Sequence, residues 1–370
     1  MKANRNLRMA GLPALGLVAA RRWMMKVSGN ASCASRAAHP GLRLSALLGF
    51  VVPFFFLSGT TPARAASTAV TTCGQVLSAA GDYELTHDLG PCEGDGVVIA
   101  ASGVHLTLAG HTISGLNPPS VCDFRTTKAT QVGVRAEGPF TDVRINGGTV
   151  TGFVSGIRLV GIPTSFIKFN VTAMTVTDSC ILGTVAAFAQ NGRIATSVAK
   201  GNGLDGIALV GASVSGICFP CIQNITVESN DASANARFGI LNEGNSITMR
   251  ENVVNGNAAL PTGAGIGIFG DNNTIDRNSA NNNKLPSGFG IVLEQGVQGN
   301  VITGNTANGN VTGIDVEQNA SSNTVQGNIA HGNSSADLND SNSACDSNIW
   351  KGNNFDTATV AGGPNPGCIR

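Results

Sequence analysis

The sequence NTIDRNSANNN at residues 273–283 belongs to a pattern that recurs through the second half of the chain. Within it, two asparagines stand five residues apart, and an alanine follows the first of them by two positions. The same spacing occurs at Asn230/Asn235, Asn252/Asn257, Asn278/Asn283, Asn305/Asn310 and Asn328/Asn333, and Asn353 and Asn354 follow. Successive copies lie 22 to 27 residues apart, a period that is typical of repeat architectures.

Each copy also contains two short apolar alternations. One begins with Gly-Ile, at residues 206, 239, 267, 290 and 313, and the other reads Asn-Thr-Ile or a variant, at residues 224, 245, 273, 300 and 323. Alternation with period two over three to five residues is typical of β-strands. We therefore predict a solenoid in which each strand pairs in parallel with its copy one coil away, at about 4.8 Å.

In such a solenoid the equivalent asparagines would stack. Asn tolerates left-handed backbone angles, and its amide can donate to one neighbour while it accepts from the other. The pattern continues towards the N-terminus in weaker form, with His111, Gly148 and Met174 at the place of Asn278, which gives about ten coils. Insertions near residues 116–131 and 211–223 interrupt the period, and we expect them to form loops on one face.

The first 65 residues differ from the rest of the chain. All nine of their charged residues are basic, an apolar run spans Leu44–Leu57, and Ala63-Arg64-Ala65 offers a cleavage site. These features predict a secretory presequence over 1–65, with no membrane span after processing and a secreted, periplasmic or cell-surface location. The remainder holds 14 basic and 23 acidic residues, a formal net charge of −9, so we expect no nucleic-acid partner.

The cysteines agree with export. Eight of the nine follow the presequence, and two pairs bracket the ends of the repeat region: Cys73 with Cys92, and Cys345 with Cys368. A solenoid exposes strand edges at both ends, so we predict disulfide-stapled caps at 66–95 and 336–370, around a β-helix at 96–335. Three pairings are open for the other four cysteines, Cys122, Cys180, Cys218 and Cys221.

The repeats Gly-Ile-x-Val/Leu and Asn-Thr-Ile-x-x-Asn-x-Ala-x-Gly-Asn resemble those of the pectate-lyase-like β-helix proteins, and the later coils are most similar to NosD-type repeats. The resemblance covers about residues 73–370 and implies an all-β, right-handed, single-stranded parallel β-helix. The catalytic signatures of pectate lyases, polygalacturonases and alginate epimerases are not found in this sequence. The resemblance therefore implies a fold and an exported carbohydrate-binding or carbohydrate-active protein, with no established reaction.

Aligning the coils places four acidic residues in one column: Glu243, Asp271, Glu294 and Glu317. The placement of Asp271 requires that Ile268, and not Ile266, is the equivalent isoleucine. Carboxylates about 5 Å apart repel, so one pKa should rise or a cation should bridge them. Such a pair could cleave a glycosidic bond as a lyase or hydrolase would, or could bind Ca²⁺. The alternative is that these side chains are solvated surface acids.

A second column contains Arg135 and Arg158, which should point outward one coil apart. Stacked like charges are unfavourable, so an anion such as a sugar carboxylate could lie between them. Glu137 offers a competing explanation, because it can neutralise the pair internally. Arg125 and Lys128 in the nearby insertion could add to the same basic region.

These patterns give three functional hypotheses. The first is a monomeric exported protein that binds or modifies an acidic polysaccharide without a cofactor. The second is a non-catalytic structural or adhesin module, and the third is a NosD-like periplasmic accessory protein for a metal cofactor. Soft copper sites use Met, Cys and His, and these residues do not cluster with ligand spacing here, so we predict no metal site. Trp350 occupies an inward column and is predicted to plug the C-terminal core.

Overall fold

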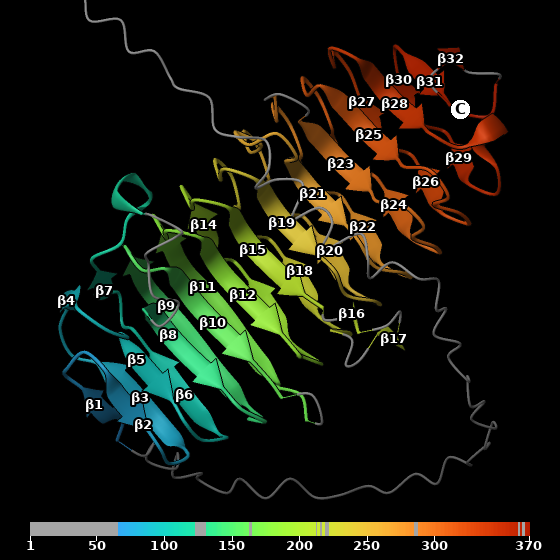
Figure 1. The fold of residues 1–370 in the computed structure, drawn as a ribbon. Helices are drawn as coiled ribbons and strands as arrows, with labels where there is room; N and C mark the ends of the chain where they lie inside the picture. Colours follow the sequence, from blue (N-terminus) through green and yellow to red (C-terminus); the bar gives the residue numbers. More distant parts are fainter. Residues whose placement is uncertain are drawn as a thin grey trace, which may run out of the picture.

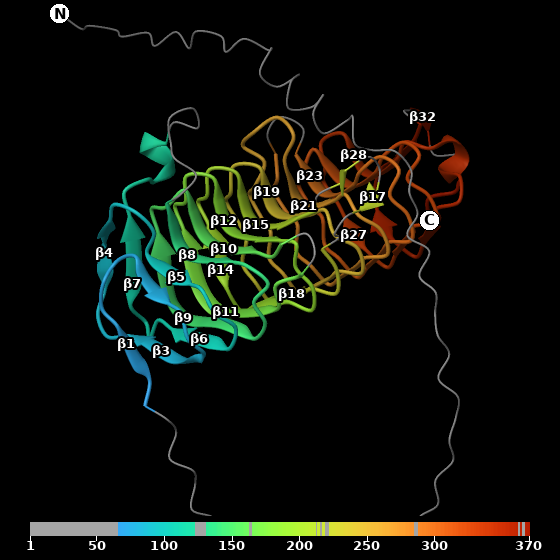
Figure 2. The same ribbon diagram turned by 60° about the horizontal axis from the view of Figure 1, so that its bottom comes forward.

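The computed structural model describes residues 66–122, 131–162, 165–211, 213–214, 217–218, 222–284, 288–361, 363–364 and 367–370. The predicted presequence lies outside the described residues. The described chain winds into a parallel β-helix of about ten coils, which confirms the predicted fold class (Figures 1 and 2). No helix in the described ranges is long and apolar enough to cross a membrane.

Two large sheets run along the solenoid, and in both of them strand order follows chain order. Sheet A consists of β1 (Thr68–Val70), β3 (Gly81–Leu85), β6 (Val104–Thr107), β9 (Val143–Thr151), β11 (Phe169–Thr177), β13 (Arg193–Ala195), β18 (Thr226–Glu228), β20 (Thr248–Arg250), β22 (Thr274–Asp276), β24 (Val301–Thr303), β26 (Thr324–Gln326) and β29 (Ile349–Lys351), with β4 (Leu89–Cys92), β7 (Thr112–Gly115) and β14 (Val198–Lys200) paired alongside.

Sheet B consists of β2 (Gln75–Leu77), β5 (Val97–Ile99), β8 (Val132–Glu137), β10 (Ser155–Val160), β12 (Leu182–Ala187), β15 (Asp205–Val210), β19 (Phe238–Asn242), β21 (Ala264–Ile268), β23 (Phe289–Leu293), β25 (Thr312–Val316), β28 (Ala336–Asp340), β31 (Ala358–Val360) and β32 (Gly363–Pro364). The strand pairs of the two sheets are parallel, apart from β31 with β32. Shorter elements are β16 (Ser213–Val214), β17 (Ile217–Cys218), β27 (Ile329–Ala330), β30 (Asn354–Phe355) and the 3₁₀ turns η1 (Pro119–Val121) and η2 (Ser343–Cys345).

Three columns of asparagine run along the corners of the later coils. Ladder 1 follows the strands of sheet A, ladder 2 precedes those of sheet B, and ladder 3 precedes those of sheet A. Ladder 1 is Asn230, Asn252, Asn278, Asn305, Asn328 and Asn353; ladder 2 is Asn202, Asn235, Asn257, Asn283, Asn310 and Asn333; ladder 3 is Asn273, Asn300, Asn323 and Asn348.

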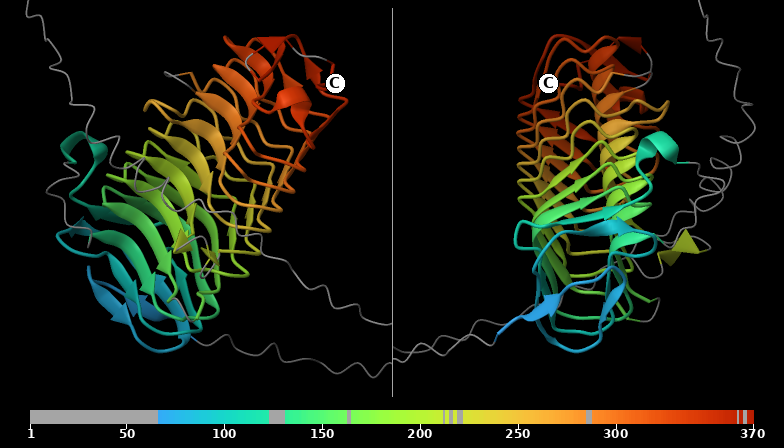
Figure 3. Two further views of the ribbon diagram at one scale, coloured as in Figure 1. Left: turned by 45° about the vertical axis from the view of Figure 1, so that its right-hand side comes forward. Right: turned by 90° about the vertical axis from the view of Figure 1, so that its left-hand side faces the viewer.

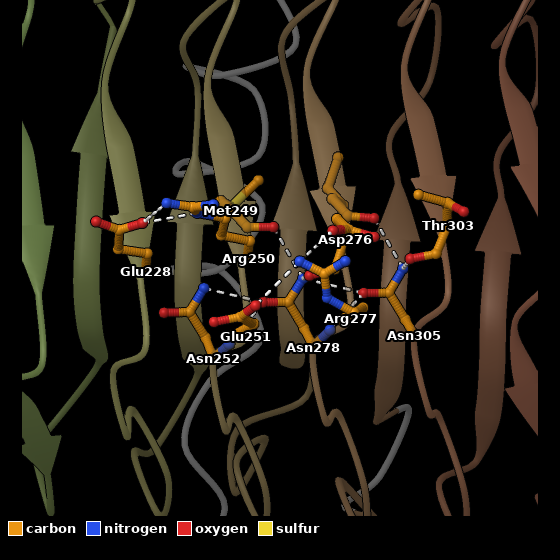
Figure 4. A network of polar contacts seen from close by, with 11 residues as sticks. Glu228, Met249, Arg250, Glu251, Asn252, Asp276, Arg277, Asn278, Thr303 and Asn305 are labelled. Atoms are coloured by element: carbon orange, nitrogen blue, oxygen red, sulfur yellow. Dashed lines mark hydrogen bonds and ion pairs between the residues drawn. The ribbon is translucent and has the colours of Figure 1, made fainter.

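Asn278 shows how a ladder is built (Figure 4). Its backbone N and its Nδ2 donate to Oδ1 of Asn305 at 2.8 and 2.9 Å, and its own Oδ1 accepts from backbone N and Nδ2 of Asn252, both at 2.9 Å. Nδ2 also donates to the carbonyl of Met249 at 3.0 Å. The buried amide of Asn278 therefore depends mainly on the coils on both sides of it, which ties these neighbouring coils together.

The third ladder corrects part of the sequence alignment. Met249 pairs with Ile275, so Ile247 and not Asn245 lies one coil before Asn273. The asparagines at 224 and 245 are thus displaced by one and two residues from the column of Asn273, Asn300 and Asn323. By contrast, Gly148 and Met174 pair directly in the ladder 1 column, as predicted.

Close contact with ladder 2 explains the glycine of the Gly-Ile pairs at 206, 239, 290 and 313. A Cβ on Gly206 would lie 2.5 Å from Nδ2 of Asn235 and 2.8 Å from the carbonyl oxygen of Gly239. Real Cβ atoms do not approach so closely, so a side chain would displace ladder 2. The following isoleucines point inward, and Ile240, Ile266 and Ile291 are fully buried register partners in the core.

Both predicted staples are present at the ends of the solenoid. Cys73 bonds to Cys92 at the N-terminal end, and Cys345 bonds to Cys368 at the C-terminal end. Trp350 pairs with Val325, is 4% exposed and donates from Nε1 to Oδ2 of Asp340 at 2.8 Å, which confirms its role as a core plug.

Candidate functional site

The outward side of sheet B, called here the B face, carries the candidate residues of the sequence analysis. Its central column of register partners is Val98, Arg135, Arg158, Val185, Ala208, Leu241, Gly267, Val292, Asp315, Asn339 and Thr359. The column is basic in the early coils, apolar in the middle and polar in the late coils. The middle residues belong to an apolar cluster that is separate from the solenoid core.

The two insertions leave the solenoid at opposite edges of the B face. The first joins the end of β7 to the start of β8, and a disulfide between Cys122 and Cys180 fastens it to the turn before β12. The second leaves at the end of β15 and includes the antiparallel pair β16–β17. Figure 3 (right) shows η1 and this pair projecting from the same side of the solenoid. Arg125, Lys128 and Cys221 lie outside the described residues.

Arg135 and Arg158 are direct register partners, as predicted, and their side chains are 34% and 35% exposed. Both contact acids. Arg135 pairs with Asp95 at 2.8 Å and more distantly with Glu137 at 3.6 Å, while Nε of Arg158 lies 3.0 Å from Glu137. Glu137 therefore lies between the two guanidinium groups and partly neutralises them. The sequence identified Glu137 as a competitor but missed Asp95, which comes from the preceding coil.

The structure corrects the predicted acidic column. Ile240 pairs with Ile266, so Asp271 falls outside the column and Phe269 takes its place between Glu243 and Glu294. Asp271 instead accepts a hydrogen bond from the backbone N of Gln298 at 2.8 Å in the following turn. Both Ile266 and Ile268 fit a period-two pattern. The sequence analysis took Ile268 as the equivalent of Ile240, and this choice was wrong. Glu294 and Glu317 stay adjacent in the column and are half-buried.

Glu243 lies in the middle of the B face, directly after β19. Its Oε2 accepts from the backbone N of Gly211 at 3.0 Å, where the second insertion begins. Burial, with a smaller contribution from the negative charge of Asp205, raises the pKa of Glu243 to about 7, against the opposing effects of that hydrogen bond and of Arg237. A carboxyl group with such a pKa is partly protonated at neutral pH.

Sequence reasoning missed the polar pair that accompanies Glu243. Asp205 is fully buried at the start of β15, and it accepts from Nε and Nη2 of Arg237 at 2.8 and 2.5 Å. The guanidinium of Arg237 also lies 5.1 Å from the centre of the Phe238 ring, which meets Phe269 edge-on at 6.0 Å. In the sequence this ion pair is visible only as an Asp just before the Gly-Ile pair at 206 and an Arg just before the Gly-Ile pair at 239, one coil later.

Asp315 is the second buried acid of the B face. It is 5% exposed, and its Oδ1 accepts from Nδ2 of Asn339 at 2.5 Å. Burial first, then the charges of Glu317 and Asp340, raise the pKa of Asp315 to about 7, although the Asn339 hydrogen bond lowers it. The late coils of this face thus hold a second carboxyl group that gains its charge near neutral pH.

The outward side of sheet A has a different chemistry, in which charges pair across coils. Glu228 pairs with both Arg193 and Arg250, and Arg277 pairs with Glu251 at 2.9 Å (Figure 4). In the early coils, His105 bridges Asp82 and Asp142, with both contacts at 3.1 Å. In the described part of the chain, no group of three or more His, Cys, Asp or Glu side chains is placed to hold a metal ion.

Among the solved structures with similar folds are three whose names refer to a polysaccharide. The A-module of a mannuronan C-5 epimerase from Azotobacter vinelandii (AlgE6) has a TM-score of 0.56 and 18% identity, over 80% of this chain and 90% of that one. A mutant of the periplasmic alginate epimerase AlgG has a TM-score of 0.49 and 13% identity, over 75% and 74% of the chains. The catalytic unit of an α-1,3-glucanase from Streptomyces thermodiastaticus has a TM-score of 0.43 and 14% identity, over 78% and 64%.

At these identities the likeness shows the fold alone. A comparison with curated protein sequences found no match. The family model described as periplasmic copper-binding protein (NosD) matches residues 145–367, which is more than half of the chain and includes the coils that carry the three ladders. The chain therefore belongs to the NosD family of β-helix proteins.

Proposed function

We propose that this is an exported polysaccharide-binding protein whose ligand is an acidic glycan lying along the solenoid axis on the B face. One observation carries the proposal: Arg135 and Arg158 are adjacent register partners on an outward sheet surface, and about a third of each side chain is exposed. A guanidinium group presents forked donors that match a carboxylate, so two of them one coil apart suit successive uronate groups.

The internal acids limit the strength of this attraction without abolishing it. Asp95 is 12% exposed and also accepts from the backbone N of Val132 at 3.0 Å, so part of its charge is used within the protein. Glu137 is shared between two arginines. The chain after the presequence carries a net charge of −9, so attraction of a polyanion depends on this local site. Such attraction weakens as salt rises, because exposed charges are screened beyond about 8 Å at physiological ionic strength.

The test is binding of a uronate polymer and of a neutral glucan to the purified protein at low and high salt. We expect the uronate polymer to bind more tightly and salt to weaken it. The double variant Arg135→Ala/Arg158→Ala should lose most of this binding. The matched control is Arg144→Ala/Arg193→Ala, which removes two arginines from sheet A. Equal binding by the B-face variant and wild type would refute the site, and absence of binding would favour a structural or adhesin module.

Export is part of the same proposal. The presequence pattern predicts it, the three disulfides of the described chain suit an oxidising compartment, and the NosD family is described as periplasmic. Localisation of the full chain by cell fractionation tests this point.

Copper binding is a second candidate, because the NosD family is described as periplasmic copper-binding proteins. The described residues do not fit it well. The matched segment contains one His, two Met and four Cys, and Cys180 and Cys345 are held in disulfides. Equilibrium dialysis of the full chain against Cu(I) and Cu(II) separates the two candidates, since one metal ion retained per chain would support the family description.

A further inference from the structure

The middle of the B face contains a carboxyl group that the arginine site does not use. Glu243 lies in the same outward column as Phe269, and the Phe269 ring meets Phe238 edge-on. Leu241, Phe238 and Phe269 belong to the apolar cluster of this face. Leu241 and Phe238 are only 6% and 4% exposed, and Phe269 is partly buried against them. A carboxyl group beside such a buried apolar cluster is unusual, because burial without a charged partner costs free energy.

The charged groups around Glu243 do not neutralise it. From β15 it faces Asp205, which is an acid, and from its own strand it faces Arg237. Arg237 is committed to Asp205 by two hydrogen bonds. The equivalent residue of β21 is the apolar Phe269. One oxygen of Glu243, Oε2, accepts from Gly211, and among the described residues the other oxygen has no hydrogen-bond partner.

Glu243 is also within reach of a polymer held at the arginines. Arg158 lies on β10 and Glu243 follows β19, and β12 and β15 separate them in the sheet. At about 4.8 Å per coil the two positions are roughly 14 Å apart along the axis. An extended polymer that follows the axis is therefore long enough to reach both Arg158 and Glu243, which is itself partly exposed.

Building on the proposed function, we propose that Glu243 is a second contact for the same acidic glycan: its protonated carboxyl donates a hydrogen bond to a sugar oxygen, and its ionised form repels the polymer. Binding should then be tight in mildly acidic solution and weak in mildly alkaline solution. With a pKa of about 7, only about one carboxyl in eleven keeps its proton at pH 8, so we expect binding to weaken by up to about tenfold between pH 5.5 and pH 8.

The experiment measures binding of polygalacturonate by the full chain at pH 5.5 and pH 8 at constant ionic strength. Ordinary carboxyl groups have pKa values near 4, so the polymer stays ionised over this range. Glu243→Gln keeps a donor and can never ionise, so it should bind as well at pH 8 as at pH 5.5. Glu294→Gln, in the same column beyond Phe269, is the matched control and should keep the wild-type pH dependence. Thermal melting confirms that both variants are folded.

The outcomes separate the two proposals. Wild-type binding without pH dependence, or a pH dependence that Glu243→Gln retains, overturns the role of Glu243 and leaves the arginine site standing. Loss of binding by Glu243→Gln at both pH values, with a wild-type melting temperature, shows that the carboxylate is required and also overturns the proposal. No binding of polygalacturonate at either pH overturns this inference together with the proposed function.

Discussion

The coils before residue 196 and those after it fill the ladder 1 column with side chains of different chemistry. In the ladder 1 column the early coils place Gly148 and Met174, and the later coils place asparagines. The change takes one coil, in which the backbone N of Met174 donates to Oγ of Ser197, and the backbone N of Ser197 donates to Oδ1 of Asn230. An apolar side chain in this column needs only to fill the available volume. An asparagine also needs a hydrogen-bond partner in the coil before it and in the coil after it.

The difference predicts how the two regions respond to substitution. Asn278→Ala should have the largest effect, because it removes the acceptor of both the backbone N and Nδ2 of Asn252. It also removes the side-chain donor to Oδ1 of Asn305 and to the carbonyl of Met249, while the backbone N of residue 278 still donates to Asn305. Each unsatisfied buried group costs about 1–3 kcal/mol, so we expect a loss of roughly 2–6 kcal/mol of unfolding free energy, measured by denaturant titration.

Asn281→Ala is the comparison variant for the ladder. Asn281 is half-buried, and its Oδ1 accepts from the backbone N of Asn308 at 2.7 Å. It belongs to an outer column of asparagines with Asn255 and Asn308. Its substitution should still cost less than that of Asn278, since water can replace its partner. Equal shifts in melting temperature would show that the inner column has no special role.

The staples provide a second comparison, between the two ends of the solenoid. The double variant Cys345→Ser/Cys368→Ser opens a disulfide with a sequence separation of 23 residues. A loop of this size is worth about 3 kcal/mol in the chain-entropy description. We expect the late coils to lose hydrogen-exchange protection first and the early coils to keep theirs. A uniform loss of protection would mean that the solenoid unfolds as one unit.

The smallest predicted effect is the pH dependence of the unfolding free energy, which has opposite signs for an acid of the late coils and an acid of the early coils. The folded-state pKa of Asp315, about 7, lies above the value of about 4 that an aspartate has in an unfolded chain, so the folded state keeps a proton that the unfolded state releases. Stability therefore falls as pH rises from about 4 to 7. Asp315→Asn should remove this loss and stabilise the protein at pH 8 by on the order of 2 kcal/mol, measured by chemical denaturation.

An early-coil acid serves as the control of opposite sign. Hydrogen bonds from His105 and then Arg144 lower the pKa of Asp142 below its ordinary value. Its contribution is present above the unfolded pKa and is lost as pH falls through the folded one. Asp142→Asn should therefore lower stability at pH 8, and this loss should shrink as the pH falls below the unfolded pKa. If both variants changed stability in the same direction at pH 8, the assigned causes would be wrong.

The sequence was most informative where the same residue type recurs at the same position of successive coils. The asparagines, the Gly-Ile pairs and the terminal cysteines predicted the solenoid, two of its ladders and both staples. The bond between Cys122 and Cys180 could not be predicted, because it depends on how the first insertion folds back to the turn before β12.

The site was predicted less well than the fold. Register on the B face depends on loop lengths, and the loop between Asn257 and β21 made Ile268 look equivalent to Ile240 when Ile266 is its partner. Asp95, Asp205 and Arg237 were missed because each acts through a partner in another coil. Period-two alternation gives the direction of a side chain, and only the register between coils gives its neighbours.

The agreement between strand order and chain order has a kinetic consequence. Each new coil pairs with the coil before it, and in ladder 1 the paired amides are only 22 to 27 residues apart. Such a chain can fold progressively as it is delivered N-terminus first, because no early strand waits for a distant late one. The bond between Cys345 and Cys368 closes after the last coil has formed, so it locks a rod that has already grown to full length.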